Sequence, residues 1–181
     1  SGTNSLVFSS FIGGSGLDRV NGIGVDGSGN IYIGGVTDSS NFPTSGAFQG
    51  SNGGNSDGFV SKFSYSAPTL SLEYSTYLGG SNQDAVMDLA VNSGGYAFVC
   101  GYSKSGNFPT YNASDSSHSG DSDVIVACFS LAGNTLEYAT FLGTTGQDIA
   151  KGIAVDINGT AYITGFTANE SGTFPTVGQY M

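Results

Sequence analysis

The sequence predicts an all-β chain built from about three copies of one unit of four antiparallel strands, and two observations support this class. First, one motif occurs three times: an aromatic residue, two small residues, a second aromatic residue, Leu or Ile, and Gly-Gly or Gly-Thr, followed by Asp. Its copies begin at Phe8, Tyr74 and Tyr138. Second, apolar and polar residues alternate along these segments, as in half-buried strands, and no segment shows a helical period. A self-similar chain of this kind is best interpreted as repeats of one supersecondary unit.

The repeat is 64–66 residues long. Phe-Pro-Thr triplets begin at Phe42, Phe108 and Phe174, so successive triplets are 66 residues apart, whereas Gly79 and Gly143 are 64 residues apart. The copies span approximately residues 5–70, 71–135 and 136–181, and we interpret residues 1–181 as one repeat array.

Each copy is expected to contribute up to four strands. The first is predicted at 6–12, 72–78 and 136–142, the second at 22–26, 88–92 and 152–156, the third at 31–37, 96–103 and 161–167, and the fourth at 57–63 and 123–129. Between the second and third strands lie Asp-, Asn- and Gly-rich segments such as residues 26–30, which are typical of hairpin turns.

A long polar connection precedes each fourth strand, and we expect it to run between sheets. Two complete sheets would then span residues 57–103 and 123–167, and an incomplete one residues 6–37. The middle of each second strand carries a small residue, Gly24, Ala90 or Ala154, which would let sheets stack as closely as the radially packed blades of a β-propeller. Because propellers close with about four to eight blades, three would form an incomplete ring on their own.

Four motifs at fixed spacing resemble one known family. They are Tyr-Ser-Thr-Tyr-Leu-Gly-Gly from Tyr74, Ile-Ala-Val-Asp from Ile153, Phe-Pro-Thr, and Asp-Gly-Phe-Val-Ser-Lys-Phe from Asp57. Together they resemble the bacterial and archaeal SBBP (seven-bladed β-propeller) repeats. The resemblance implies a secreted or cell-surface propeller-repeat protein. It carries over no functional residues, because members of the family generally lack an assigned activity.

Composition and charge exclude several classes of function. The 181 residues include 30 Gly, only 10% are charged, and 14 acidic against 4 basic residues give a net charge of -10. Such a chain offers no basic patch for phosphates, so nucleic acid is not an expected partner. No apolar run reaches the length of a membrane span.

Recurrent aspartates are the candidate metal ligands. Asp18, Asp84 and Asp148 follow the three copies of the first motif. Carboxylates on Gly-rich turns suit Ca²⁺, and the competing interpretation is that these side chains cap turns. No other cofactor is expected.

Cysteines and glycosylation signals bear on the compartment. Cys100 and Cys128 are either two buried thiols or a disulfide, which would need an oxidising compartment. Asn112, Asn158 and Asn169 stand in Asn-x-Ser/Thr sequons and are candidate glycosylation sites of an extracellular or cell-surface glycoprotein.

Function is predicted from what the chain offers and lacks. With His118 as the single histidine there is no nucleophilic dyad, so we expect no enzyme. The favoured hypothesis is an extracellular structural protein, a subunit of a surface assembly or filament completed by strand pairing between copies. Its assembly edge would be the open first blade, at Leu6, Phe8, Phe11 and Ile12. One alternative is a glycan-binding or adhesive module that uses the aromatic residues of the Phe-Pro-Thr loops. The third is a carboxylate-dependent glycoside-active enzyme, although no pair of acidic residues stands out.

Overall fold

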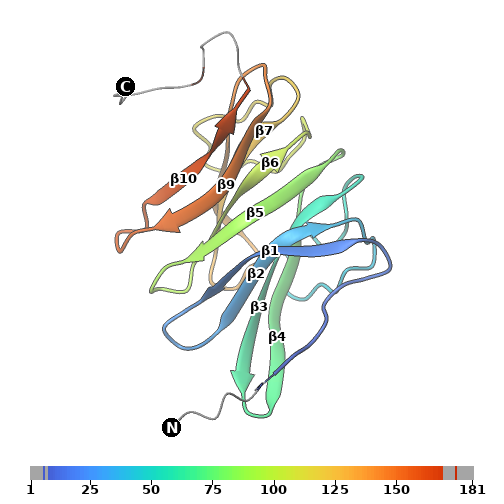
Figure 1. Ribbon diagram of the computed structural model, residues 1–181, viewed down its shortest axis with the longest axis vertical. Helices are drawn as coiled ribbons and strands as arrows, with labels where there is room; N and C mark the ends of the chain where they lie inside the picture. The colour runs from blue at the N-terminus through green and yellow to red at the C-terminus, as the bar shows by residue number, and fades with distance from the viewer. Residues whose placement is uncertain (1–5, 7, 169–173, 175–181) are drawn as a thin grey trace.

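A computed structural model describes residues 6, 8–168 and 174 of the chain. The described part contains ten strands and no helix, which confirms the all-β class (Figure 1). The strands are β1 (Asp18–Val25), β2 (Ile31–Thr37), β3 (Asp57–Ser66), β4 (Thr69–Leu78), β5 (Asp84–Val91), β6 (Ala97–Ser103), β7 (Asp123–Phe129), β8 (Leu136–Leu142), β9 (Asp148–Val155) and β10 (Ala161–Thr167).

The strands form two four-stranded sheets and one two-stranded sheet, all with antiparallel neighbours. The first blade has the order β1-β2-β3-β4, the second blade has the order β5-β6-β7-β8, and the third sheet pairs β9 with β10. Each open four-stranded antiparallel sheet corresponds to one propeller blade, and the three sheets together are an incomplete set of blades. In Figure 1 the three sheets follow one another from the lower right to the upper left of the view.

The predicted limits of the blades were wrong. The sheets run from residue 18 to 78 and from 84 to 142, so the first predicted strand of each copy closes the preceding blade. The long connection of residues 38–56 joins β2 to β3 and therefore lies within one blade. On its way it passes along the outer edge of β4. There Ser45 and Ser75 exchange main-chain hydrogen bonds of 3.0 and 2.8 Å, and the chain then returns to begin β3.

The strand predicted at residues 6–12 is absent from the described residues of that segment. In the later copies the same motif forms β4 and β8, which pair with β3 and β7. In the described chain, no strand equivalent to β3 or β7 precedes the first copy of the motif. Residues 8–12 therefore lie against the first blade without forming a strand. Ile12 packs beside a cluster of buried residues that includes Ile33 and Phe59.

The first strand of each sheet starts four residues earlier than predicted, at Asp18, Asp84 and Asp148, and is interrupted by a bulge. A glycine of the neighbouring strand faces each bulge. A Cβ added at Gly101 would lie 1.9 Å from the carbonyl oxygen of Ala85, and Gly35 and Gly165 are equally crowded. Only glycine fits there, because any side chain would overlap backbone.

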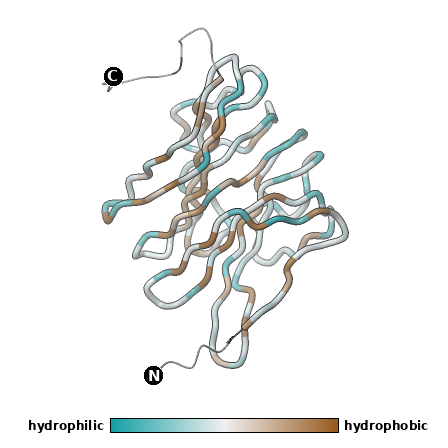
Figure 2. Tube along the Cα trace, in the orientation of Figure 1, coloured by the Kyte–Doolittle hydropathy of each residue, from teal (hydrophilic) through white to brown (hydrophobic). Residues whose placement is uncertain are grey.

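Apolar residues gather between the sheets, and hydrophilic residues gather in the connecting loops (Figure 2). The largest cluster fills the space between the first and second blades and includes Tyr74, Leu78, Val99, Ile125 and Phe129. A smaller cluster around Cys100 and Val126 packs against residues of the third sheet. Burial between successive sheets is therefore what holds the array together.

Candidate functional site

The recurrent aspartates Asp18, Asp84 and Asp148 lie one at the start of each sheet. The carboxylate of Asp18 accepts a hydrogen bond from the amide of Gly14 at 2.7 Å, that of Asp84 from Gly80 at 2.6 Å, and that of Asp148 from Thr144 at 2.7 Å. Each side chain thus caps the turn before its own strand, as one of the two interpretations predicts.

A serine adds a second bond at two of these carboxylates. The hydroxyl of Ser39 donates to Asp18 at 3.0 Å, and that of Ser105 donates to Asp84 at 2.7 Å. Within the described residues no group of three or more His, Cys, Asp or Glu side chains is placed to hold a metal ion. Calcium at Asp18, Asp84 and Asp148 stays a prediction.

Two further aspartates, Asp57 and Asp123, were not identified from the sequence as candidate site residues. Asp57 and Asp123 begin β3 and β7, and both are buried. Asp57 accepts hydrogen bonds from the amide of Gly53 at 2.9 Å and from Nε2 of Gln49 at 2.8 Å. The signal was present in the sequence, since both residues open the fourth-strand motif 66 positions apart.

These aspartates lie at the junctions between sheets. Asp57 follows Ser56, whose carbonyl accepts a bond from the amide of Asp84, and Asp123 follows Ser122, which receives the amide of Asp148 in the same way. Burial raises the pKa of Asp57 to about 6, and the charge of Asp84 adds to the shift. Burial likewise raises the pKa of Asp123, and Asp148 contributes. Both carboxyl groups are thus enclosed at a junction between two sheets.

Both cysteines are buried free thiols, so of the two options left open by the sequence the disulfide was wrong. Cys100 pairs with Val126 and Cys128 with Phe98, which places the two cysteines diagonally across β6 and β7. Diagonal neighbours in a sheet are typically about 7–8 Å apart, beyond the usual reach of a disulfide. Burial raises the pKa of each thiol to about 12.

Two of the three sequons lie on the surface. Asn112 is exposed with a φ of 45°, and its Nδ2 donates to the carbonyl of Glu137 at 3.1 Å. Asn158 is exposed in the turn between β9 and β10, and Asn169 lies outside the described residues. Glycosylation at these positions stays a prediction.

In the described residues, the phenylalanines of the first two Phe-Pro-Thr loops are buried and form no exposed aromatic platform. Phe42 is buried with its ring centroid 4.4 Å from that of Phe59, and Phe108 is buried 5.6 Å from Phe141. Of the other loop aromatics, Phe48 packs against Phe129, and Tyr180 lies outside the described residues. The phenylalanines therefore fill gaps within and between blades.

Among the described residues, exposed apolar side chains lie at both ends of the array. We call the side of a sheet that points to the next sheet its forward face, and the opposite side its rear face. The rear face of the first blade exposes Val20, Ile23 and Val25, near the exposed Phe8 and Phe11. Leu6 is also exposed. Of the predicted edge residues, Phe8, Phe11 and Ile12 border a pocket with Ile23 on this rear face, although they form no strand.

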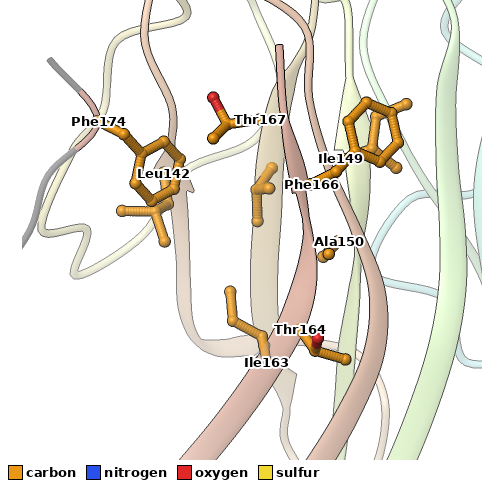
Figure 3. Close-up of a pocket in the computed structure, with 10 residues that line it drawn as sticks. Leu142, Ile149, Ala150, Ile163, Thr164, Phe166, Thr167 and Phe174 are labelled. Carbon is orange, nitrogen blue, oxygen red and sulfur yellow. The ribbon is translucent and has the colours of Figure 1, made fainter. Parts of the chain in front are cut away.

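At the other end, a cavity of about 400 Å³ lies between β10 and the outer strands of the second blade (Figure 3). It is lined mainly by apolar side chains, including Leu142, Ile149, Ile163 and Phe174. The sequence pattern could not locate this cavity because its walls come from two sheets.

Comparison with protein families supports the repeat interpretation. The family model described as "SBBP: Beta-propeller repeat" matches residues 8–43 and 137–170. No curated protein matches the chain. In the described part of the chain, no helix is long and apolar enough to cross a membrane.

Proposed function

The chain belongs to the SBBP beta-propeller repeat family, and from its two end surfaces we propose that it is an extracellular structural protein that assembles with copies of itself. The proposed role is to form a surface assembly or filament, and it involves no catalysis. The extracellular location is part of the proposal. It is supported by the exposed sequons Asn112 and Asn158 and by the low content of charged residues.

The contact between the first two blades serves as the template. A Cβ at Gly24 would lie 2.9 Å from Cγ2 of Val91, and one at Gly34 would lie 2.8 Å from Cγ1 of Val86. The forward face of the first blade thus rests directly on the rear face of β5. Close approach of this kind needs small residues on one side and branched apolar residues on the other.

Each end of the array presents one of the two faces that form this contact, and in the described part of the chain the other face is not there to cover it. On the forward face of the third sheet, Tyr162 is 57% exposed, whereas its counterpart Tyr32 is fully buried. On the rear face of the first blade, Ile23 is 68% exposed, whereas its counterpart Leu89 is 4% exposed. This pairing of complementary uncovered faces is the observation that carries the proposal.

Two such faces on one chain allow a head-to-tail contact between copies. A contact of this type is heterologous, so it gives a closed ring when the rotation between copies closes and a filament when it does not. Uncovered apolar patches on a repeat array are expected to be satisfied by further repeats.

Light scattering of the native protein, with electron microscopy of the same sample, tests the proposal. We expect a closed oligomer or a polymer, and a strictly monomeric particle would overturn the proposal. Ile23→Glu places a charge on the rear face and should shift the particle toward monomer. Ile157→Glu is the matched control, because Ile157 is 90% exposed in the turn between β9 and β10.

A glycan-binding or adhesive role is the second candidate, supported by a different surface. A cleft of about 500 Å³ is bordered by Phe48, Tyr111, Asn112, Asn134 and Glu137. Tyr111 is 54% exposed, and an aromatic ring beside amide and carboxylate groups is suited to a sugar. Binding on a glycan array that is lost in Tyr111→Ala would support this role, and an array without binding would remove it.

A further inference from the structure

From Ala161 to Phe166, the edge of β10 that faces away from β9 has no partner strand among the described residues. In the first blade, β2 pairs with β1 on one side and with β3 on the other, and in the second blade β6 is likewise flanked by β5 and β7. Among the described residues, β10 pairs only with β9. Over residues 161–166, a strand edge of this kind presents main-chain N–H and C=O groups to an extended segment.

The cavity beside this edge supplies room for side chains. Ile163 of the third sheet and Leu142 of the second blade both border it (Figure 3), and Ile149 and Val124 are among its other lining residues. The residues Thr164, Gly165 and Thr167 of β10 also border it. An extended segment hydrogen-bonded to β10 would therefore direct alternate side chains into an apolar space.

The same place in the second blade is filled by β7. There Leu78 and Val99 are the counterparts of Leu142 and Ile163, and both belong to one buried cluster with Ile125 of β7. Ile125 is the third residue of β7, as Phe59 is the third residue of β3. The cavity thus has the position that the third residue of a β3-like or β7-like strand would occupy.

We infer that β10 is an acceptor site for one extended strand of the pattern Asp-x-Phe/Ile-Val-Ser/Ala-x-Phe, supplied by another repeat of this family. The strand adds antiparallel to β10 in the register of β2 with β3, where Thr37 faces Asp57 and Ile31 faces Phe63. Phe166 then faces the second residue of the donor strand, as Val36 faces Gly58, and Ala161 faces its last phenylalanine. This inference concerns strand addition at an edge, so it goes beyond the packing of faces proposed above.

The sixth residue of the donor strand decides whether a β3-like or a β7-like strand fits the site better. In the first blade, Nζ of Lys62 lies 5.0 Å from the ring centroid of Tyr32, its partner on β2. β6 has Phe98 at this position, opposite Cys128. β10 has Tyr162, so the site favours a β3-like strand whose lysine can lie over an exposed tyrosine ring.

A peptide of residues 56–64 with Phe59→Trp tests the site. The protein contains no Trp, so tryptophan emission reports the peptide alone. We expect a saturable blue shift as the indole enters the apolar cavity. Exchanging positions 58 and 59 of the peptide moves the ring to the opposite face of the strand and should abolish the shift. An absent shift, or an equal shift with the exchanged peptide, would overturn the inference.

Two further changes test where and how the peptide binds. Leu142→Glu puts a charge in the cavity and should weaken binding at least about tenfold. Leu131→Glu, at an exposed leucine outside the cavity, should leave binding unchanged. Lys62→Glu in the peptide should also weaken binding, and this variant leaves the protein unaltered. Unchanged affinity in both Leu142→Glu and the Lys62→Glu peptide would reject the site.

The outcome separates this site from the proposed self-assembly. A monomeric protein that binds the peptide would uphold the acceptor site and reject assembly. An assembled particle with which the peptide shows no fluorescence shift would uphold self-assembly and reject the acceptor site.

Discussion

The amide of Asp84 donates a hydrogen bond of 2.8 Å to the carbonyl of Ser56, and this bond joins the first strand of the second blade to the residue just before the third strand of the first. The amide of Asp148 makes the same bond to Ser122 at 2.7 Å. Each bond lies beside an isolated parallel bridge, Ser56 with Gln83 and Ser122 with Gln147, next to the buried Asp57 and Asp123. The junction between successive sheets therefore combines main-chain pairing with carboxyl groups that are removed from water.

The raised pKa of Asp57 predicts a pH dependence of stability. The folded-state value of about 6 lies above the usual value of about 3.9, so the folded state binds this proton more tightly than the unfolded state. The contribution is fully present below about pH 3.9 and is lost as the pH rises through about 6. We expect the free energy of unfolding, measured with urea, to fall over this range in the wild type and to fall less in Asp57→Asn.

Asp38→Asn is the control for this prediction, because Asp38 is an exposed aspartate. Its pH profile should match that of the wild type. Identical profiles for Asp57→Asn and the wild type would show that Asp57 is not the group responsible.

The crowded glycine opposite the bulge of β5 predicts a large effect of one methyl group. Gly101→Ala should destabilise the protein by at least about 2 kcal/mol, because the new Cβ would meet the carbonyl of Ala85 at 1.9 Å. Gly27→Ala serves as the control, since nothing lies within 4 Å of a Cβ at that position. Thermal unfolding of both variants checks the difference, and equal melting temperatures would contradict it.

The buried thiols predict low reactivity in the folded protein. Burial holds the pKa values of Cys100 and Cys128 at about 12, so almost no thiolate forms near neutral pH. A thiol reagent should modify neither cysteine in native buffer and both in denaturant. Fewer than two reactive thiols after denaturation without reductant would indicate a disulfide instead.

The packed phenylalanine of the second Phe-Pro-Thr loop predicts a loss of stability on truncation. Phe108→Ala should cost about 3–5 kcal/mol, since the ring is buried beside Phe141. Tyr111→Ala, three residues further on at an exposed ring, should cost far less. Urea unfolding of the two variants makes the comparison, and similar losses would mean that the loop is not anchored by Phe108.

Local signals in the sequence located the hairpin turns and most of the strands, but not the starts of β1, β5 and β9. The turn at residues 26–30 forms as expected, with the amides of Ser28 and Asn30 bonded to the carboxylate of Asp26 at 2.9 Å. The third strands, such as Ile31–Thr37, were also located. Hairpin turns and strand alternation depend on neighbouring residues, so a pattern can show them.

The grouping of strands into blades depends on contacts that no local pattern contains. The connection of residues 38–56 looks like a linker between sheets, yet Ser45 is bonded to Ser75, thirty residues later. The bulge after Val20 breaks the alternation of β1, which hid the first four residues of that strand. The proximity of Asp57 to the start of β5 likewise follows from the packing of two sheets.

The offset between repeat and blade determines how the protein can be cut or pulled apart. β4 belongs to the second sequence repeat but is hydrogen-bonded into the first blade, so dividing the chain at the repeat boundary near residue 70 would strip one blade of its outer strand. Tension applied between the repeats would have to shear β4 from β3 before the blades could separate. The natural units for truncation and for mechanical unfolding are therefore residues 18–78 and 84–142, because the five residues between them belong to no strand.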